Sequence, residues 1–181
     1  MRSVSEQPGR YQRSAGGMVG AMLVLLAVIA AFVVFRDINR TDPVRPVPDV
    51  NYEQTLSYAR DQAGFAVLAP DPLPAGWRAT TVEFVPEPTR WHLGMLTDEE
   101  RYVGIEQALS SPTDMVETYV DAEATRSGTV TIDGTRWQVW SDSGGDTALV
   151  RRGGEVTTLV VGRVSRPQLT GFVADLVAAS S

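Results

Sequence analysis

The sequence predicts an α+β protein in which one N-terminal transmembrane helix precedes a mainly antiparallel sheet of about seven strands, packed with about three helices. Three observations lead to this class. Residues 16–35 read GGMVGAMLVLLAVIAAFVVF, a run of twenty residues without a charge. Beyond residue 50, β-rich runs follow one another across short turn signals such as Asp133-Gly134. Segments with helical periodicity stand before, between and after these runs.

The uncharged run has the length of a membrane span. At about 1.5 Å per residue it covers the roughly 30 Å hydrocarbon core of a bilayer. It is longer than the 7–15 apolar residues of a signal peptide and lacks a small-x-small cleavage site, so an uncleaved anchor is expected. The domain organisation then reads as a cytoplasmic tail 1–15, a transmembrane helix 16–35, a Pro-rich linker 36–50 and an extracytoplasmic domain 51–181.

The orientation is not decided by charge. Three Arg precede the run and three, Arg36, Arg40 and Arg45, follow it, so the positive-inside rule gives no preference. We expect a single-pass cell-membrane protein with a cytoplasmic N-terminus, because long domains translocate largely regardless of their charge.

Small residues form a stripe within the predicted span. Their spacing would let two helix backbones approach closely, which makes a homodimer through the span one hypothesis. The alternative is that Gly and Ala are simply common in membrane helices. The residues of this candidate helix–helix face are Gly16, Gly20, Ala27 and Ala31.

The folded domain opens with a helix and a proline-rich loop. Asn51 as N-cap, with Gln54 three residues later, predicts a helix over 52–63. Phe65–Leu68 suits a short strand, and three prolines between 70 and 74 then impose a loop.

Three strands and a helix follow. Alternating apolar residues predict strands over 78–85, 89–97 and 101–109, with Asp98–Glu100 as the turn between the last two. The three carboxylates of that turn either bind a cation or form a solvated hairpin tip. Ser111 as N-cap and Pro112 in the first turn predict a helix over 112–124.

The second half is expected to contain two hairpins and a final helix. A two-residue turn at Asp133-Gly134 pairs Val130 with Trp137 and leaves Trp140 on the polar face. Trp140 is then either covered by a helix or loop or marks a contact surface. Gly153-Gly154 is the second turn, 156–161 is a central strand, and a helix begins near residue 165.

Composition excludes several functions. The chain has no Cys, which rules out disulfides, thiol nucleophiles and Cys-ligated metals. From Pro46 onward it carries 10 Arg against 19 Asp and Glu, a net charge near −9, which disfavours nucleic acid. His92 is the single histidine, on the opposite face of its strand from Trp91 and Leu93, and no motif pairs a nucleophile with it. No catalytic residue, cofactor or metal site is expected.

The chain also resembles a known family. The uncleaved span, the Pro-rich spacer, Leu73-Pro74-Ala75-Gly76-Trp77 and the pattern around Pro167, Phe172 and Leu176 are similar to the actinobacterial membrane proteins classed as domain of unknown function family 4245. This resemblance implies a bacterial envelope protein. It implies no activity and no site residues.

The functional expectation is therefore a non-catalytic interaction domain, an adaptor or accessory factor for a membrane or envelope protein. One alternative is a carrier or sensor that encloses a lipid or small ligand between walls supplied by Trp77, Trp91 and Trp137. A hydrolase built on a pair of acidic residues is a third, since the domain is acidic, but no two acids stand out.

Overall fold

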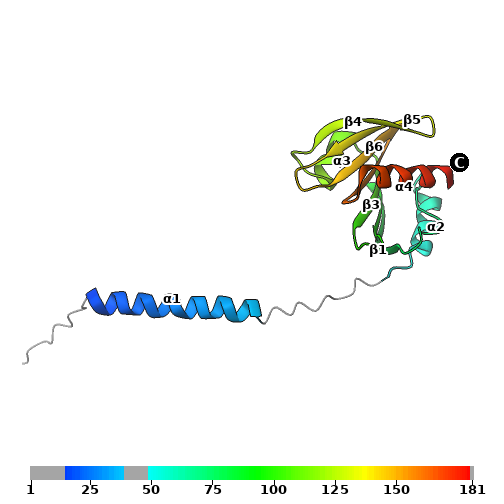
Figure 1. The fold of residues 1–181 in the computed structure, drawn as a ribbon. Helices are drawn as coiled ribbons and strands as arrows, with labels where there is room; N and C mark the ends of the chain where they lie inside the picture. The colour runs from blue at the N-terminus through cyan, green and yellow to red at the C-terminus, as the bar shows by residue number, and fades with distance from the viewer. Residues whose placement is uncertain (1–14, 39–48, 180–181) are drawn as a thin grey trace, which may run out of the picture. The chain divides into compact units, whose positions relative to one another are not determined.

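The computed structural model describes residues 15–38 and 49–179, and the chain divides into two units, Met1–Pro46 and Val47–Ser181. The first unit contains one helix, α1 (Ala15–Ile38, 24 residues), drawn in blue in Figure 1. It extends three residues beyond the predicted end at residue 35. The predicted tail up to residue 14 and the linker at 39–48 lie outside the described residues.

The large apolar side chains of α1 are exposed. Met22, Leu23, Val24, Leu25 and Leu26 are between 52% and 65% exposed. Five consecutive residues at 100° steps cover the whole circumference of a helix, so α1 has no polar face in this region. Over the residues that the structure describes, no helix is long and apolar enough to cross a membrane. The transmembrane role of 16–35 thus stays a prediction.

The second unit is built on a single antiparallel sheet of seven strands, in the order β1-β2-β3-β7-β6-β5-β4. This confirms the predicted α+β class and the antiparallel pairing. The chain makes two meanders, β1 to β3 and β4 to β7, which join where β3 pairs with β7 at the centre of the sheet. The strands are β1 (Arg78–Pro86), β2 (Thr89–Leu96), β3 (Tyr102–Ala108), β4 (Thr125–Ile132), β5 (Thr135–Ser141), β6 (Thr147–Gly153) and β7 (Val156–Gly162).

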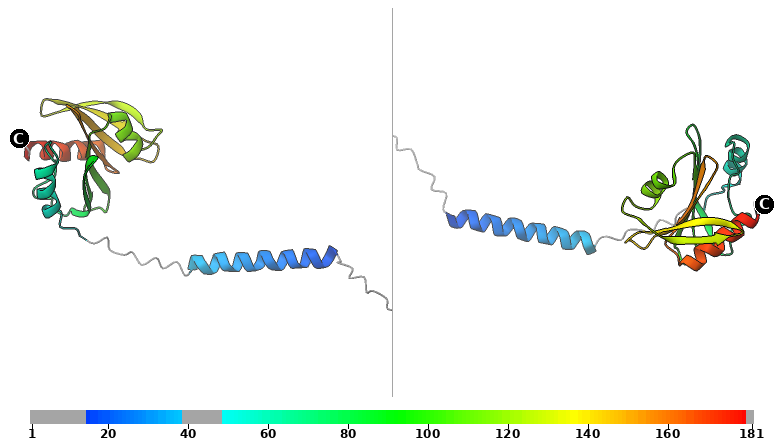
Figure 2. Two further views of the ribbon diagram at one scale, coloured as in Figure 1. Left: turned by 180° about the vertical axis from the view of Figure 1, so that it is seen from behind. Right: turned by 90° about the horizontal axis from the view of Figure 1, so that it is seen from above.

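Three helices cover the two faces of the sheet: α2 (Glu53–Gln62), α3 (Pro112–Tyr119) and α4 (Arg166–Ala179). Helices α2 and α4 pack on one face, over the larger core, and α3 packs on the other (Figures 1 and 2). The larger core includes the fully buried Trp91 and Trp137, and the α3 side has a smaller cluster around Met115 and Leu159. The two faces therefore have separate hydrophobic clusters.

One of the two predicted helix caps is confirmed. The N-cap of α2 is Tyr52, without a side-chain cap, and the predicted cap Asn51 lies one residue earlier, where its side chain accepts a hydrogen bond from the Glu53 backbone N–H at 3.0 Å. The Ser111 hydroxyl accepts one from the Asp114 backbone N–H at 3.1 Å. Each side chain satisfies a backbone donor that the first helical turn leaves free.

The predicted strand at 65–68 is wrong, because side chains rather than a neighbouring strand satisfy its backbone. The Gln107 side chain accepts a hydrogen bond from the Leu68 N–H at 2.7 Å and donates one to the Ala66 carbonyl at 3.1 Å. The Trp91 indole donates to the Leu68 carbonyl at 3.0 Å. The segment is consequently hydrogen-bonded yet irregular, with Val67 and Leu68 buried and Ala66 exposed.

The predicted helix 112–124 is too long, because α3 ends at Tyr119. The Asp121 carboxylate accepts a hydrogen bond from the Glu123 N–H at 2.7 Å, and its carbonyl accepts one from the Ala124 N–H at 3.1 Å. These local bonds give the backbone an alternative to continuing the helix.

The register of the last hairpin also differs from the prediction. Gly153 pairs with Val156, which makes Gly154-Glu155 the turn, with Gly154 at φ +64°. This register places Val150 opposite Leu159, whereas a Gly153-Gly154 turn would place Val150 opposite Thr157. Under α3, an apolar side chain opposite another apolar side chain stabilises the buried face more than one opposite a threonine. In the preceding hairpin, the predicted pairing of Val130 with Trp137 is confirmed.

Candidate functional site

Three polar side chains from three adjacent strands are connected in a line on the face of the sheet that carries α3. His92 on β2 lies in the middle. Its Nδ1 is 2.5 Å from Oε1 of Glu106 on β3, and its Nε2 is 2.8 Å from Oγ1 of Thr81 on β1. We call Thr81, His92 and Glu106 the polar relay.

The β2–β3 hairpin positions one half of the polar relay. Its register sets His92 directly opposite Glu106, while the adjacent Trp91 faces the larger core. The sequence predicted that His92 faces away from Trp91, and the structure confirms this. The sequence did not predict that a carboxylate lies on the same face beside the imidazole.

A β-bulge positions the other half. Ala79 pairs with Met95 and Thr81 pairs with Gly94, so Thr80 is the extra residue between them, and its hydroxyl donates to the Gly94 carbonyl at 3.2 Å. In a regular strand residues 79 and 81 would share a face. Because of the bulge, Ala79 is buried in the larger core while Thr81 lies on the opposite face beside His92.

Two paired glycines leave room for these side chains. Gly94 on β2 lies opposite Gly104 on β3. A Cβ atom on Gly94 would lie 2.3 Å from the Thr81 hydroxyl oxygen, and one on Gly104 would lie 2.5 Å from the Tyr102 hydroxyl oxygen. A side chain at either position would therefore displace the polar relay or the tyrosine above the glycines.

Burial increases along the polar relay. Thr81 is exposed, the His92 side chain is 22% exposed, and that of Glu106 is 2% exposed. Among the described residues, no partner hydrogen-bonds to Oε2 of Glu106. The carboxyl group is thus held away from water with only one of its oxygens hydrogen-bonded.

This environment shifts several pKa values. Burial raises the pKa of Glu106 above its ordinary 4.5, and the hydrogen bond to Glu106 raises the pKa of His92 above its ordinary 6.5. The pair therefore holds a shared proton to a higher pH than the two separate groups would. Burial, with Glu106 nearby, also raises the pKa of Tyr102 to about 12, which keeps that phenol neutral.

The geometry has a chemical consequence. An ionised Glu106 can only accept a hydrogen bond, so it fixes the proton of a neutral imidazole on Nδ1 and leaves Nε2 free to accept the proton of the Thr81 hydroxyl. Both distances lie within or close to the range in which a base activates a hydroxyl and a third group orients that base. The polar relay can therefore move a proton away from a surface hydroxyl.

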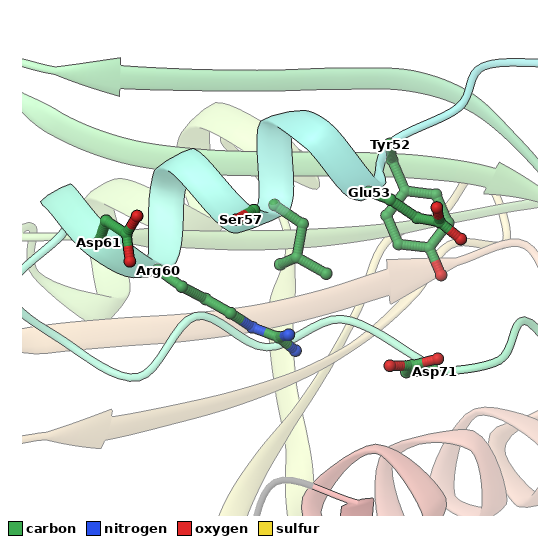
Figure 3. Close-up of a pocket in the computed structure, with 7 residues that line it drawn as sticks. Tyr52, Glu53, Ser57, Arg60, Asp61 and Asp71 are labelled. Carbon is green, nitrogen blue, oxygen red and sulfur yellow. The ribbon is translucent and has the colours of Figure 1, made fainter.

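A separate cleft of about 360 Å³ lies along α2 (Figure 3). Figure 3 shows Arg60 extending from α2 toward the side of the cleft where Asp71 lies. Tyr52, the buried polar residue of its lining, donates its hydroxyl hydrogen bond to the Pro70 carbonyl at 2.5 Å. The cleft is lined by Tyr52, Glu53, Leu56, Ser57, Arg60, Asp61 and Asp71.

The sequence-predicted contact residues lie elsewhere. Trp140 is half-buried against the cluster under α3, and its indole donates to the Gln138 side chain at 3.1 Å. Gly16, Gly20, Ala27 and Ala31 lie in α1, and the side chains at 16 and 31 are outside the described residues. A Cβ at Gly20 would meet no atom within 4 Å.

Two further hypotheses can be compared with the structure. At the turn 98–100, Glu100 pairs with Arg78 at 2.6 Å and Glu99 with Arg101 at 3.0 Å, as expected of a solvated hairpin tip. No group of three or more acidic or histidine side chains among the described residues could hold a metal ion. The tryptophans suggested as cavity walls are core residues, since Trp91 and Trp137 are fully buried and Trp77 stacks on Phe172.

Comparison with known proteins gives one match. The model of a family described as "Protein of unknown function (DUF4245)" matches residues 10–176. The chain belongs to the DUF4245 family. No curated protein and no solved structure matches it. The polar relay falls inside the residues matched by the DUF4245 model, and the family description assigns it no role.

Proposed function

We propose that this DUF4245 protein is a membrane-anchored interaction domain of the bacterial cell envelope, serving as an adaptor or accessory factor for a membrane or envelope protein. Its tail is cytoplasmic and its α+β domain extracytoplasmic.

The observation that carries the proposal is the apolar circumference of α1. A helix that is apolar on all sides needs burial in lipid or in protein. The twenty residues 16–35 contain no charge, and the consecutive side chains from Met22 to Leu26 are all exposed. Insertion into lipid would bury this apolar run.

Topology is tested by labelling with an impermeant maleimide. The native chain has no Cys, so single substitutions Ser3→Cys and Ser180→Cys each provide one thiol. Intact cells should label Ser180→Cys and leave Ser3→Cys unlabelled until lysis. The opposite pattern would place the domain in the cytoplasm, and a mature chain that lacks residues 1–35 would identify a cleaved signal peptide.

The interaction role is tested by crosslinking in membranes and isolating the full-length protein. A matched control is the same chain carrying two Arg substitutions, Leu25→Arg and Leu26→Arg, because charges near the centre of a span oppose insertion. One dominant envelope partner is expected with the native chain and not with the control. Recovery of the protein alone, or of a homodimer alone, would contradict the adaptor role.

A further inference from the structure

We propose that the Thr81 hydroxyl is a nucleophile that reacts with activated acyl esters, with His92 as its general base and Glu106 as the residue that positions the base. This inference goes beyond the proposed interaction role and does not depend on it. It also departs from the expectation of a non-catalytic domain that the sequence alone suggested.

The exposure of the three side chains follows the order that a base-activated hydroxyl requires. A base-activated nucleophile needs an accessible hydroxyl, a partly shielded imidazole and an acid that stays in place. Thr81 is exposed, His92 is 22% exposed at its side chain, and Glu106 is 2% exposed. The reactive end of the polar relay therefore faces solvent, and the orienting end is buried.

Several local features of the polar relay are unfavourable for a simple sheet. Burying a carboxyl group with one oxygen unpaired costs free energy that an apolar residue at position 106 would avoid. The bulge at Thr80 and the bare backbone at Gly94 are both needed to bring Thr81 within 2.8 Å of His92. The bulge, the glycine and the buried carboxyl group each disfavour a simple sheet, and all three support the same contact between the Thr81 hydroxyl and the His92 imidazole.

The substrate class follows from what the polar relay supplies to the reaction. General-base assistance contributes roughly 10²- to 10⁴-fold to a rate. The polar relay supplies that assistance but brings no described donor for the oxyanion of a tetrahedral intermediate. It therefore suits acyl donors whose leaving group departs easily, such as aryl esters and thioesters, rather than peptides.

The reaction balances without another reactant. The Thr81 oxygen attacks the acyl carbon, a new ester C–O bond forms, and the bond from the acyl carbon to the leaving group breaks. Nε2 of His92 takes the hydroxyl proton and passes it to the leaving group. Water then hydrolyses the acyl-threonine by the same route, which restores the Thr81 hydroxyl and releases the acid.

The composition makes the test unusually clean. The chain has no Cys, and all 16 of its basic Lys or Arg positions are Arg, so the thiols and lysine amines that usually react with acyl donors are absent. Purified full-length protein in detergent micelles is mixed with p-nitrophenyl acetate. Release of p-nitrophenolate is followed, and the acetyl group is mapped by peptide mass spectrometry after rapid acid quenching.

Four variants separate the roles. Thr81→Val should abolish acetylation at residue 81 and lower the release rate to that of the solution background. His92→Gln should lower the rate at least about 100-fold, while Thr81→Ser should retain it. Thr89→Val is the matched control, because it removes a hydroxyl of the same β1–β2 hairpin that bonds to the Pro86 carbonyl at 2.9 Å and belongs neither to the polar relay nor to the bulge.

The pH profile distinguishes a positioning role for Glu106 from a purely structural one. The rate should rise with pH as the His92–Glu106 pair loses its shared proton, and Glu106→Gln should move that rise to lower pH. Nearby charges are Glu83 on β1 and Arg90 on β2, with the neutral Tyr102 on β3 and Tyr119 on α3. A native rate equal to that of Thr81→Val, or acetylation that maps only to other residues, would overturn the proposal.

Discussion

Replacing Gln107 tests whether a single buried side chain holds the irregular segment 65–68 against the sheet. Gln107 is 2% exposed and makes three hydrogen bonds, with the Leu68 N–H, the Ala66 carbonyl and the Thr158 hydroxyl. Gln107→Ala leaves the buried Leu68 N–H without a partner, which should lower the free energy of unfolding by about 2 kcal/mol. Water can reach the Ala66 carbonyl, and the Thr158 hydroxyl can rotate. Loss of each of these two hydrogen bonds should therefore cost roughly 0.5 kcal/mol. The expected loss of unfolding free energy is about 3 kcal/mol.

The measurement is urea unfolding of the full-length protein in micelles, followed by tryptophan fluorescence. All four Trp lie between residues 77 and 140, so the signal reports the α+β domain alone. With a slope of about 2 kcal/mol per molar urea, the midpoint should fall by roughly 1.5 M. Gln138→Ala is the matched control, because Gln138 accepts one half-buried hydrogen bond from Trp140 and its loss should cost about 1 kcal/mol or less.

Equal losses for the two variants would refute the reasoning. The same conclusion would follow if Gln107→Ala cost under about 1 kcal/mol, since the Leu68 N–H would then have found another partner.

Three further predictions concern the polar relay and α3. Gly94→Ala should destabilise the domain by about 2 kcal/mol in the same unfolding assay, because its Cβ would lie 2.3 Å from the Thr81 hydroxyl oxygen; adding Thr81→Ala should recover part of that loss, and no recovery would contradict the clash. Because the folded-state pKa values of Glu106 and His92 lie above their ordinary 4.5 and 6.5, the folded chain binds more protons than the unfolded chain, and stability should fall as pH rises from 4.5 to beyond 6.5. Urea midpoints across that range should show this slope in the native chain and a weaker one in Glu106→Gln, whereas a slope unchanged by the substitution would assign it to other groups. Ser111→Ala should cost about 1 kcal/mol through the lost cap of α3, while Ser111→Asp should cost little.

Much of the fold follows from local patterns in the sequence. Alternation of apolar residues located β1, β2 and β3, turn signals located the two hairpins of the second half, and the cap at Ser111 located the start of α3. One of the two contacts of the polar relay, between His92 and Glu106, also follows from a local pattern. A three-residue turn at 98–100 sets Thr97 opposite Arg101 and, by counting outward, His92 opposite Glu106, which is the register that the structure has.

The rest depended on contacts between residues far apart in the chain. No local signal marks the bulge at Thr80, which turns Thr81 to the face of His92, because a bulge is defined by the partner strand as well as by its own residues. The segment 65–68 reads as a strand, but it finds its hydrogen-bond partners on Gln107, about forty residues later. The last hairpin shifted because Val150 packs better opposite Leu159 than opposite Thr157. The sequence by itself therefore determined the elements and the apolar run of α1. Tertiary packing decided the register, the bulge and the one place where a hydroxyl, an imidazole and a buried carboxyl group meet, because only long-range contacts can offset the cost of burying that carboxyl group.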